Sequence, residues 1–288
     1  MLWIPLSLLT ALAVASQDAW VKRHFADRGP VVMAAVPLVY GLPGFALGLV
    51  LTPVPPLDGV FWVCLAASVP INGAALVVYM ESIRRAPLST TLPYLAFTPT
   101  FMLVTGRLLL GEAPSAWGAA GVLATCVGGY VLNLAPGQRR WTDPLRAVGR
   151  DPGAWRMLVV ALLFAFAAPV GKRGILHASP MFFTFSFFTL LSAATWTATM
   201  VWGRGLRRGV LSRPGRGMAA GLLLFAHAAG HGWAISLTQA SYMIAVKRLS
   251  IVFGMLYGGL WFGERQFAVR ITGAAIMLAG AAVIVIGG

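Results

Sequence analysis

Residues 238–265 read TQASYMIAVKRLSIVFGMLYGGLWFGER, and this stretch decides the fold class. Most of it is apolar, and it is long enough for a helix to cross a bilayer, which needs roughly 20 residues. Its last part, GGLWFGE at 258–264, matches GRLLLGE at 106–112, about 150 residues earlier in the chain. A second helix of the same kind in the first half indicates an internal repeat of membrane-spanning segments.

The composition of the whole chain is that of an integral membrane protein. Of its 288 residues, 58% are hydrophobic and 10% are charged, and the mean hydropathy is +0.80. Soluble domains carry about 25% charged residues, so an ordinary soluble domain is excluded. Walker-type, GxGxxG and His-rich patterns do not occur in the sequence, so we do not expect an ATP-driven pump. A nucleophile, base and orienting group are not found in a credible constellation, so no enzyme is expected either.

Ten segments are predicted to span the membrane, because each is apolar and ends at a charged or Pro/Gly-rich break. They cover residues 2–21, 31–51, 59–80, 88–110, 115–134, 156–176, 180–202, 217–238, 240–262 and 267–286.

The two halves of the chain can be overlaid. WVKRHFADRGP (20–30) matches VGKRGILHASP (170–180), and the glycines of the fifth and tenth spans also match. Because five spans per half is an odd number, the second half must be inserted upside down relative to the first. The sequence therefore predicts an all-α membrane protein with ten transmembrane helices in two inverted five-helix repeats, over residues 1–134 and 156–288, joined by a linker at 135–155.

The net charge of +14 comes from the connections between the predicted spans. Of the Lys and Arg residues, 17 lie in or beside the odd-numbered connections and three in the even-numbered ones. The positive-inside rule predicts that the odd connections are cytoplasmic, which would place both termini outside. Cations in short loops between spans do not indicate a nucleic-acid partner.

Five helices per half, a GE at the end of the fourth helix and a Gly-rich fifth helix resemble the EamA-type members of the drug/metabolite transporter superfamily. The resemblance covers essentially the whole chain. It implies a multi-pass transporter of the cell (inner) membrane without a cofactor, and it implies cytoplasmic termini, opposite to the charge bias. The partners expected are the lipid bilayer and the substrate, and the Gly-rich spans could also pack in a homodimer.

Lys247 and Arg248 stand side by side inside the ninth predicted span, about 10 Å deep at 1.5 Å per residue. A mid-membrane cation costs about 2.5 to 3.5 kcal/mol on insertion scales, so it faces a cavity or a partner unless its side chain snorkels to the interface. The pair resembles the phosphate-binding element of plastid triose-phosphate translocators. The partner Lys that those proteins place on the fourth helix has no counterpart around residues 93–95.

Other polar residues follow helical spacing on the third, fourth, eighth and ninth spans, which are therefore expected to surround a polar chamber. The predicted substrate-binding residues are Lys247, Arg248, Ser250, Tyr257, Tyr94, Thr98, His227, His231, Asn72 and Tyr79.

The acidic residues suggest two further roles. Asp18 is the only acid clearly inside a predicted span, where it could pair with Lys22 or carry a proton that drives transport. Glu112 and Glu264 occupy matching helix ends and could cap the helix that follows each of them. His227 and His231 have no carboxylate or thiolate neighbours in the sequence pattern, so a metal site is not expected.

Three functions remain open at the level of sequence. Excess positive charge in a low-dielectric chamber favours transport of a small organic anion or phosphorylated metabolite by alternating access. A flippase for an anionic lipid would use the same cations on a headgroup phosphate. The family resemblance also allows an exporter of amino acids or neutral metabolites, in which the cations only snorkel.

Overall fold

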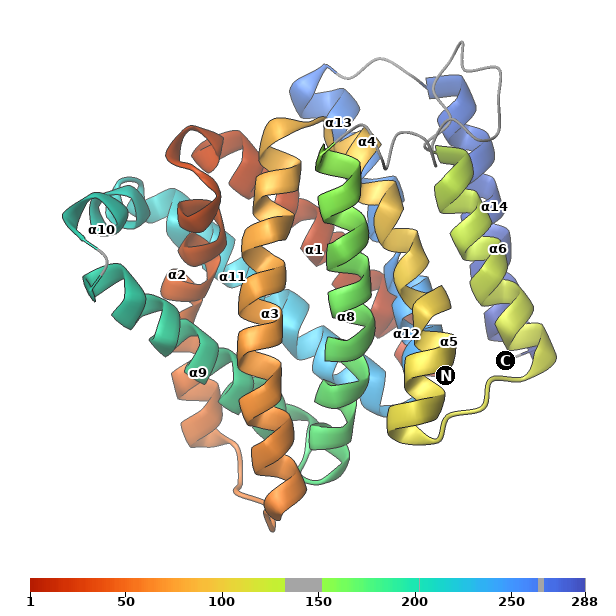
Figure 1. The fold of residues 1–288 in the computed structure, drawn as a ribbon, viewed down its shortest axis with the longest axis horizontal. Coiled ribbons are helices and arrows are strands. Elements are labelled where there is room, and N and C mark those ends of the chain that lie inside the picture. The colour runs from red at the N-terminus through yellow and green to blue at the C-terminus, as the bar shows by residue number, and fades with distance from the viewer. Residues whose placement is uncertain (133–151, 202, 264–266, 288) are drawn as a thin grey trace.

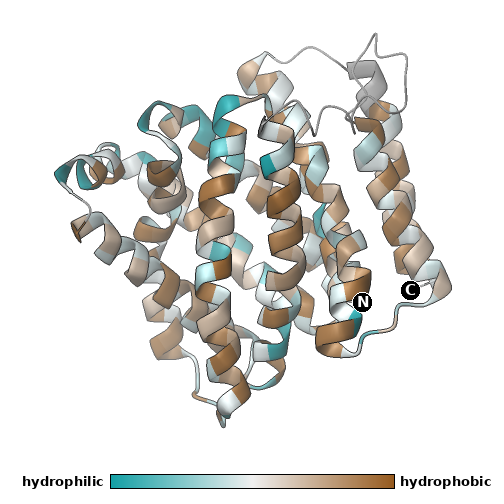
Figure 2. Ribbon diagram, viewed as in Figure 1, coloured by the Kyte–Doolittle hydropathy of each residue, from teal (hydrophilic) through white to brown (hydrophobic). Residues whose placement is uncertain are grey.

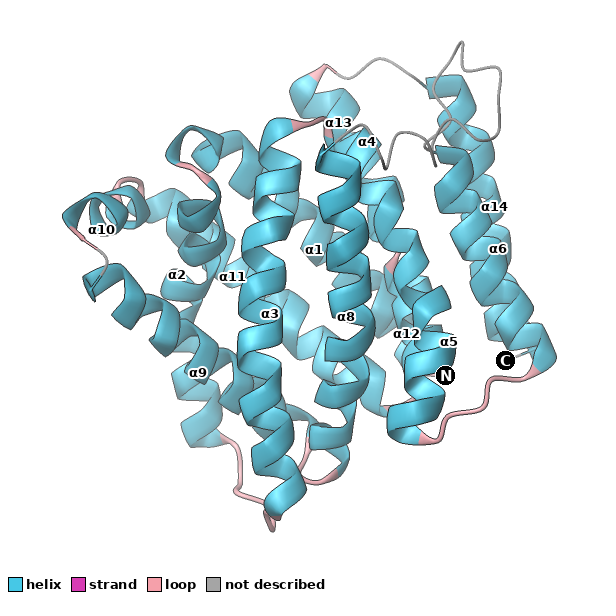
Figure 3. Cartoon of the chain, viewed as in Figure 1, coloured by secondary structure: helices cyan, strands magenta, loops and turns pink. Residues whose placement is uncertain are grey.

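The computed structural model describes residues 1–132, 152–201, 203–263 and 267–287. These residues form helices and no strand, as Figure 3 shows. Most of the predicted linker, and Glu264 with it, lies outside the described residues.

The order of elements follows the predicted repeat. The first half contains α1 (Trp3–Phe25), η1 (Ala26–Arg28), α2 (Pro30–Leu51), α3 (Gly59–Arg85), α4 (Leu88–Thr91), η2 (Leu92–Ala96), α5 (Phe97–Leu110) and α6 (Ala116–Leu132). The second half contains α8 (Pro152–Leu176), α9 (Pro180–Val201), α10 (Arg204–Leu211), α11 (Pro214–Ser236), α12 (Ala240–Lys247), α13 (Ser250–Phe262) and α14 (Phe267–Gly287).

Seven helical segments of the described chain are long and apolar enough to cross a membrane. They are α1 with η1, α2, α3, α8, α9, α11 and the segment formed by α12 and α13. The helices Ala116–Leu132 and Ile271–Gly287 are apolar but shorter, and the predicted span 88–110 is divided among α4, η2 and α5. The all-helical membrane architecture is confirmed, whereas the count of ten complete spans stays a prediction.

The outer surface of the bundle suits contact with lipid tails. Large apolar side chains are exposed on several helices, including Trp62 on α3 (58% exposed), Leu108 on α5 (76%) and Leu222 on α11 (70%). Figure 2 shows hydrophobic residues along α3 and α8, while hydrophilic residues gather around α10. A bundle that exposes such residues along its helices belongs in hydrocarbon rather than in water.

Two helices are interrupted at matching places of the predicted repeat. In the first half, the 3-10 helix η2 separates α4 from α5 and contains Pro93, which has no N–H to donate. In the second half, α12 ends at Lys247 and α13 begins at Ser250, and the Leu249 N–H bonds to the Val246 carbonyl in a tightened, 3-10-like turn. The cationic pair therefore lies at the junction of two half-helices.

The glycines of α6 and α14 let these two helices pack closely, at the right of Figure 1. A Cβ atom on Gly121 would lie 2.7 Å from the carbonyl oxygen of Gly280, and one on Gly128 would lie 2.7 Å from that of Gly273. Small residues allow such close approach in membranes, where lipid is as apolar as a helix surface. These glycines thus serve a contact within the chain, and the predicted homodimer does not follow from them.

Gly121→Ala is expected to destabilise the protein by about 1–3 kcal/mol, because the added methyl group must push two backbones apart. The matched control is Gly215→Ala at the start of α11, where a Cβ meets nothing within 4 Å. Thermal unfolding of both variants in detergent would measure the difference. Equal melting temperatures would contradict the close packing of α6 on α14.

Asp58 fixes the start of α3 and links it to the end of α8. Its Oδ1 accepts a hydrogen bond from the Phe61 N–H at 3.0 Å, and its Oδ2 lies 2.6 Å from Nδ1 of His177. The backbone hydrogen bond from Phe61, and then the contact with His177, hold the pKa of the Asp58 carboxyl below its ordinary value.

Helix packing crosses between the two halves throughout the bundle. Helix α3 packs on α8 and α1 packs on α11, while α2 packs on α9. In the same way α5 contacts α8, and α13 contacts α1. The halves are therefore interleaved rather than side by side, and the helices between them enclose the candidate site.

Candidate functional site

A central cavity of about 180 Å³ lies among helices of both halves. Its walls come from α1, α3, α8, α9, α11 and α12, with residues from η2 and α5. The lining reaches from the middle of the bundle to Ile175 and Phe183, where α8 ends and α9 begins. Its polar residues are Gln17, Asp18, Ser68, Asn72, Tyr79, Thr98, Lys172, Thr184, His227, His231, Lys247, Arg248 and Ser250.

Lys247 is held inside the cavity by two histidines from α11. Its Nζ lies 2.8 Å from Nε2 of His227 and 3.2 Å from Nδ1 of His231. An ammonium can only donate hydrogen bonds, so a protonated Lys247 faces the lone pairs of two neutral imidazoles. Because α11 places both histidines within its span, the Lys247 side chain points into the bundle and does not snorkel to the interface.

Arg248 connects the two interrupted helices. Its Nη2 donates to Oγ1 of Thr98 at 2.8 Å, and the side chain is only 6% exposed. Thr98 belongs to the first turn of α5, just after η2, so the contact joins the interruption in one half to that in the other. Within the described residues, neither Arg248 nor Lys247 forms an ion pair.

Asp18 contributes a carboxylate to the same cavity. Its Oδ2 accepts a hydrogen bond from the Tyr79 hydroxyl at 2.5 Å, and both side chains are buried. Lys22, which the sequence offered as a partner of Asp18, donates to the carbonyl of Ala86 at 2.6 Å. Asp18 is the only acidic residue that lines the cavity in the described part of the chain.

Lys172 and Glu112 form a largely buried ion pair, which the sequence pattern does not predict. Lys172 Nζ bonds to Oε1 of Glu112 and also donates to the Thr238 carbonyl at 2.6 Å. The other oxygen of Glu112 accepts from the Ala240 N–H at 2.8 Å, at the start of α12. The prediction that Glu112 caps a helix is correct in kind, but the helix is α12 and not the one that follows it in sequence.

Several buried polar atoms of the cavity have no hydrogen-bond partner among the described residues. They include two donors or acceptors of the cationic region, Arg248 Nε and His227 Nδ1, together with Gln17 Oε1 and Ser68 Oγ. Folded proteins seldom leave buried polar groups unpaired, and each exception requires an explanation. Because these atoms belong to residues that line one cavity, they could form hydrogen bonds with a polar ligand.

Most of the predicted site residues meet at this cavity, but two do not. Tyr257 lies outside the lining, and its hydroxyl is 2.8 Å from Oγ of Ser16 on α1. Tyr94 is buried in the apolar core, also outside the lining. In the described part of the chain, no group of three or more His, Cys, Asp or Glu residues could hold a metal ion.

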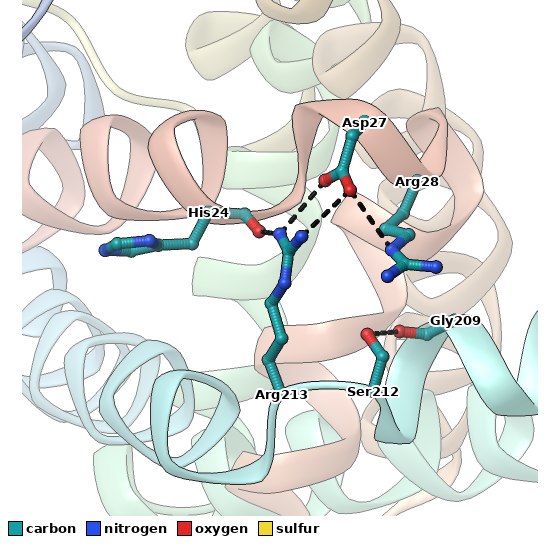
Figure 4. A network of polar contacts seen from close by, with 6 residues as sticks. All are labelled: His24, Asp27, Arg28, Gly209, Ser212 and Arg213. Carbon is teal, nitrogen blue, oxygen red and sulfur yellow. Dashed lines mark hydrogen bonds and ion pairs between the residues drawn. The ribbon is translucent and has the colours of Figure 1, made fainter.

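The opposite end of the bundle is tied by a separate polar network, shown in Figure 4. Arg213, at the start of α11, donates to both carboxylate oxygens of Asp27 at 3.0 Å and to the carbonyl of His24. Arg28 also contacts Asp27, at 3.2 Å. These contacts join the end of α1 to the start of α11, and they are structural.

Comparison with known proteins agrees with this architecture. The model of the EamA-like transporter family, which is part of the drug/metabolite transporter superfamily, matches residues 1–134. A solved structure titled "Crystal structure of protein" is similar over 96% of this chain and 95% of its own, with 14% identity and a TM-score of 0.60. At this identity the likeness concerns the fold alone. No curated protein matches the chain.

Proposed function

Because residues 1–134 place this multi-pass membrane protein in the EamA-like transporter family, we propose that it is a secondary active transporter for a small organic anion or phosphorylated metabolite. The observation that carries the proposal is the pair of cations in the central cavity, Lys247 and Arg248, whose hydrogen-bond partners are all neutral. Lys172 provides the contrast, because Glu112 already neutralises it.

Uncompensated charge explains why these cations would bind an anion. Removing an ion from water costs several kcal/mol, and the cost is recovered only through a counter-charge or strong hydrogen bonds. Lys247 and Arg248 have hydrogen bonds but no carboxylate partner among the described residues. An anionic substrate would supply the missing charge in a low-dielectric site, where the attraction is strong.

The packing pattern supports two inverted repeats of five helices. Under the sequence overlay, α3 on α8 becomes α11 on α1, and α5 on α8 becomes α13 on α1. The contacts of α2 with α9, and of α6 with α14, map onto themselves. This is the pattern expected for a pseudo-two-fold axis, and with five spans in each half that axis would lie in the membrane plane.

Alternating access would use the two interrupted helices. The 3-10 turns at η2 and between α12 and α13 lie beside the cationic site, and such turns often mark hinges. Arg248 and Thr98 join the two interruptions, so a substrate that displaced this contact would act on both at once. Binding at the cavity would thereby bias the positions of the half-helices.

The proposal is tested by uptake into proteoliposomes that contain the purified protein. Radiolabelled organic anions should enter, and organic cations of similar size should not, because the cavity excludes positive charge. Transport of a fluorescent anionic lipid without uptake of any water-soluble anion would instead support a flippase. Uptake that favours neutral or zwitterionic metabolites over anions would contradict an anion site.

Asp18→Asn is expected to uncouple transport from a proton gradient. Protonation of Asp18 would remove the negative charge that the described residues contribute to the lining, and so strengthen the attraction of Lys247 and Arg248 for an anion. Asparagine stays neutral at every pH, so the variant should exchange anions across the membrane without accumulating them when protons flow inward. Arg207→Gln on α10, an exposed position, is the control. Proton-driven accumulation at the wild-type level in Asp18→Asn would rule out this role.

The proposal also includes an orientation of the protein in the membrane. The protein is expected in the cell (inner) membrane, and the charge bias predicts that α10, which carries Arg204, Arg207 and Arg208, faces the cytoplasm. A cysteine introduced at Ser212 would then resist an impermeant thiol reagent in intact cells. Rapid labelling there would support cytoplasmic termini instead.

A further inference from the structure

We infer that the transported anion is an amphipathic monoanion, with one carboxylate-like charge attached to an aromatic or branched apolar body. This inference rests on the proposed function and narrows it to a substrate class. It follows from the cationic and the apolar side chains that line the central cavity, from the charges of the lining and from the cavity's size.

The cationic pair of the cavity and most of its large aromatic side chains come from different helices. Helix α11 provides His227 and His231, and the end of α12 provides Lys247 and, one residue beyond it, Arg248. Helices α8 and α9 provide large apolar side chains, which we call the apolar wall: Phe164, Ile175, Phe183, Phe187, Phe188 and Leu191. A substrate that contacts both the cationic pair and the apolar wall must have a charged end and an apolar end.

The charges of the lining match a single negative charge. Lys247 and Arg248 are cationic, Asp18 is anionic when ionised, and the two histidines accept from Lys247 as neutral rings. Lys172 is neutralised by Glu112. With Asp18 ionised, the described lining therefore carries one net positive charge, which a monoanion balances and a dianion would reverse.

The size of the cavity limits the apolar body. An apolar cavity of about 150 Å³ accommodates benzene. At about 180 Å³, the central cavity suits a ring or branched chain of that size together with a carboxylate. Sugars of this size would leave hydroxyl groups against the phenylalanine side chains without hydrogen-bond partners, and such burial is unfavourable.

The buried polar atoms without hydrogen-bond partners indicate where the charged end of the substrate would bind. Arg248 Nε is a buried donor of the cavity lining and lacks an acceptor among the described residues. A carboxylate next to it would accept from Arg248 and Lys247, while the apolar body points to the apolar wall. The carboxylate would then have hydrogen-bond donors, and the apolar body would have apolar neighbours.

The test compares binding of phenylacetate, acetate and phenyl phosphate to the purified full chain by calorimetry at pH 8. Phenylacetate should bind about tenfold or more tightly than acetate, since it also buries its ring. It should likewise bind more tightly than phenyl phosphate, which is a dianion at this pH. Equal affinity for acetate and phenylacetate, or tighter binding of phenyl phosphate, would overturn the inference.

Two variants on α9 form a matched pair for the apolar wall. Phe187 lines the cavity, whereas Phe185 does not and stacks on Phe225, and both are 8% exposed. Phe187→Ala should weaken phenylacetate binding about fivefold or more and leave acetate binding unchanged, and Phe185→Ala should change neither. If Phe187→Ala does not fold, Phe187→Leu is measured, with a smaller loss expected. An unchanged affinity for phenylacetate in the folded Phe187 variant would contradict the apolar wall.

The two proposals fail in different ways. If acetate and phenylacetate bind equally well and both depend on Lys247, the anion transporter stands and the apolar wall is wrong. If none of the anions binds, or if binding is the same in Lys247→Gln, the proposed function itself is wrong.

Discussion

Lys247→Gln is expected to abolish anion transport without destabilising the protein. Removing one member of a buried, hydrogen-bonded charge pair costs about 2–5 kcal/mol of binding, which corresponds to a loss of about 30-fold or more in affinity. The ammonium has no carboxylate partner in the described chain, so its removal relieves an uncompensated charge in the empty protein. The melting temperature of the ligand-free variant should therefore equal or exceed that of the wild type.

Three measurements check this prediction: anion uptake into proteoliposomes, the melting temperature without ligand, and the rise in melting temperature on adding ligand. Lys247→Arg, which keeps the charge, should retain part of the uptake. The exposed Arg207→Gln should behave as wild type in all three. Normal uptake by Lys247→Gln would exclude this residue from the binding site.

Glu112→Gln is expected to have the opposite effect on stability. Its carboxylate neutralises Lys172, and both side chains are largely buried, at 13% and 9% exposure. Breaking a buried pair by removing one partner leaves an unpaired charge, which costs about 3–5 kcal/mol. Glutamine can still accept from the Ala240 N–H, so the loss of stability reports on the ion pair and not on the helix cap.

The double variant Glu112→Gln/Lys172→Met supplies the control. With no charge left to bury, it should recover most of the stability that the single variant loses. Thermal and urea unfolding in detergent would measure both. A stable Glu112→Gln protein, or a double variant as unstable as the single one, would show that the pair is not the source of stability.

The sequence reveals the fold class and part of the site because its signals are local. Apolar runs end at Pro, Gly or charged residues, so eight of the ten predicted segments are single helices close to the predicted bounds in the described chain. The spacing of His227 and His231 puts both on one face of α11, toward Lys247. Repeat matching then pairs the fourth span with the ninth, and Thr98 does contact Arg248.

Two predicted residues lie elsewhere because the helices are interrupted. Assigning residues three and four positions apart to one face assumes a continuous α-helix. The turn between Lys247 and Ser250 has 3-10-like hydrogen bonds, so the face of α13 that carries Tyr257 meets Ser16 on α1. No Pro or Gly marks this turn in the sequence. Tyr94 lies in η2, where three residues per turn direct it into the core.

Lys172 and the apolar wall are not evident from local sequence, because both depend on contacts between distant segments. Lys172 precedes Arg173 at the end of a span and has the pattern of a loop cation. Its burial depends on Glu112, 60 residues away, and on the Thr238 carbonyl. The available sequence signal for these residues is the internal repeat, in which WVKRH matches VGKRG and the GE of the first half matches the GE of the second. The phenylalanine run of α9 is indistinguishable from a lipid-facing sequence until the fold brings it to a cavity that α11 and α12 also line.

The central claim is that Lys247 binds the negative charge of the substrate. The most direct measurement is a cycle of four dissociation constants, for phenylacetate and its uncharged isostere phenylacetamide, each with the wild type and Lys247→Gln. We expect the wild type to prefer the carboxylate by about 30-fold or more, and the variant, which keeps Arg248, to lose most of that preference while binding the amide as before. A preference for the carboxylate that is the same in both proteins would contradict the account.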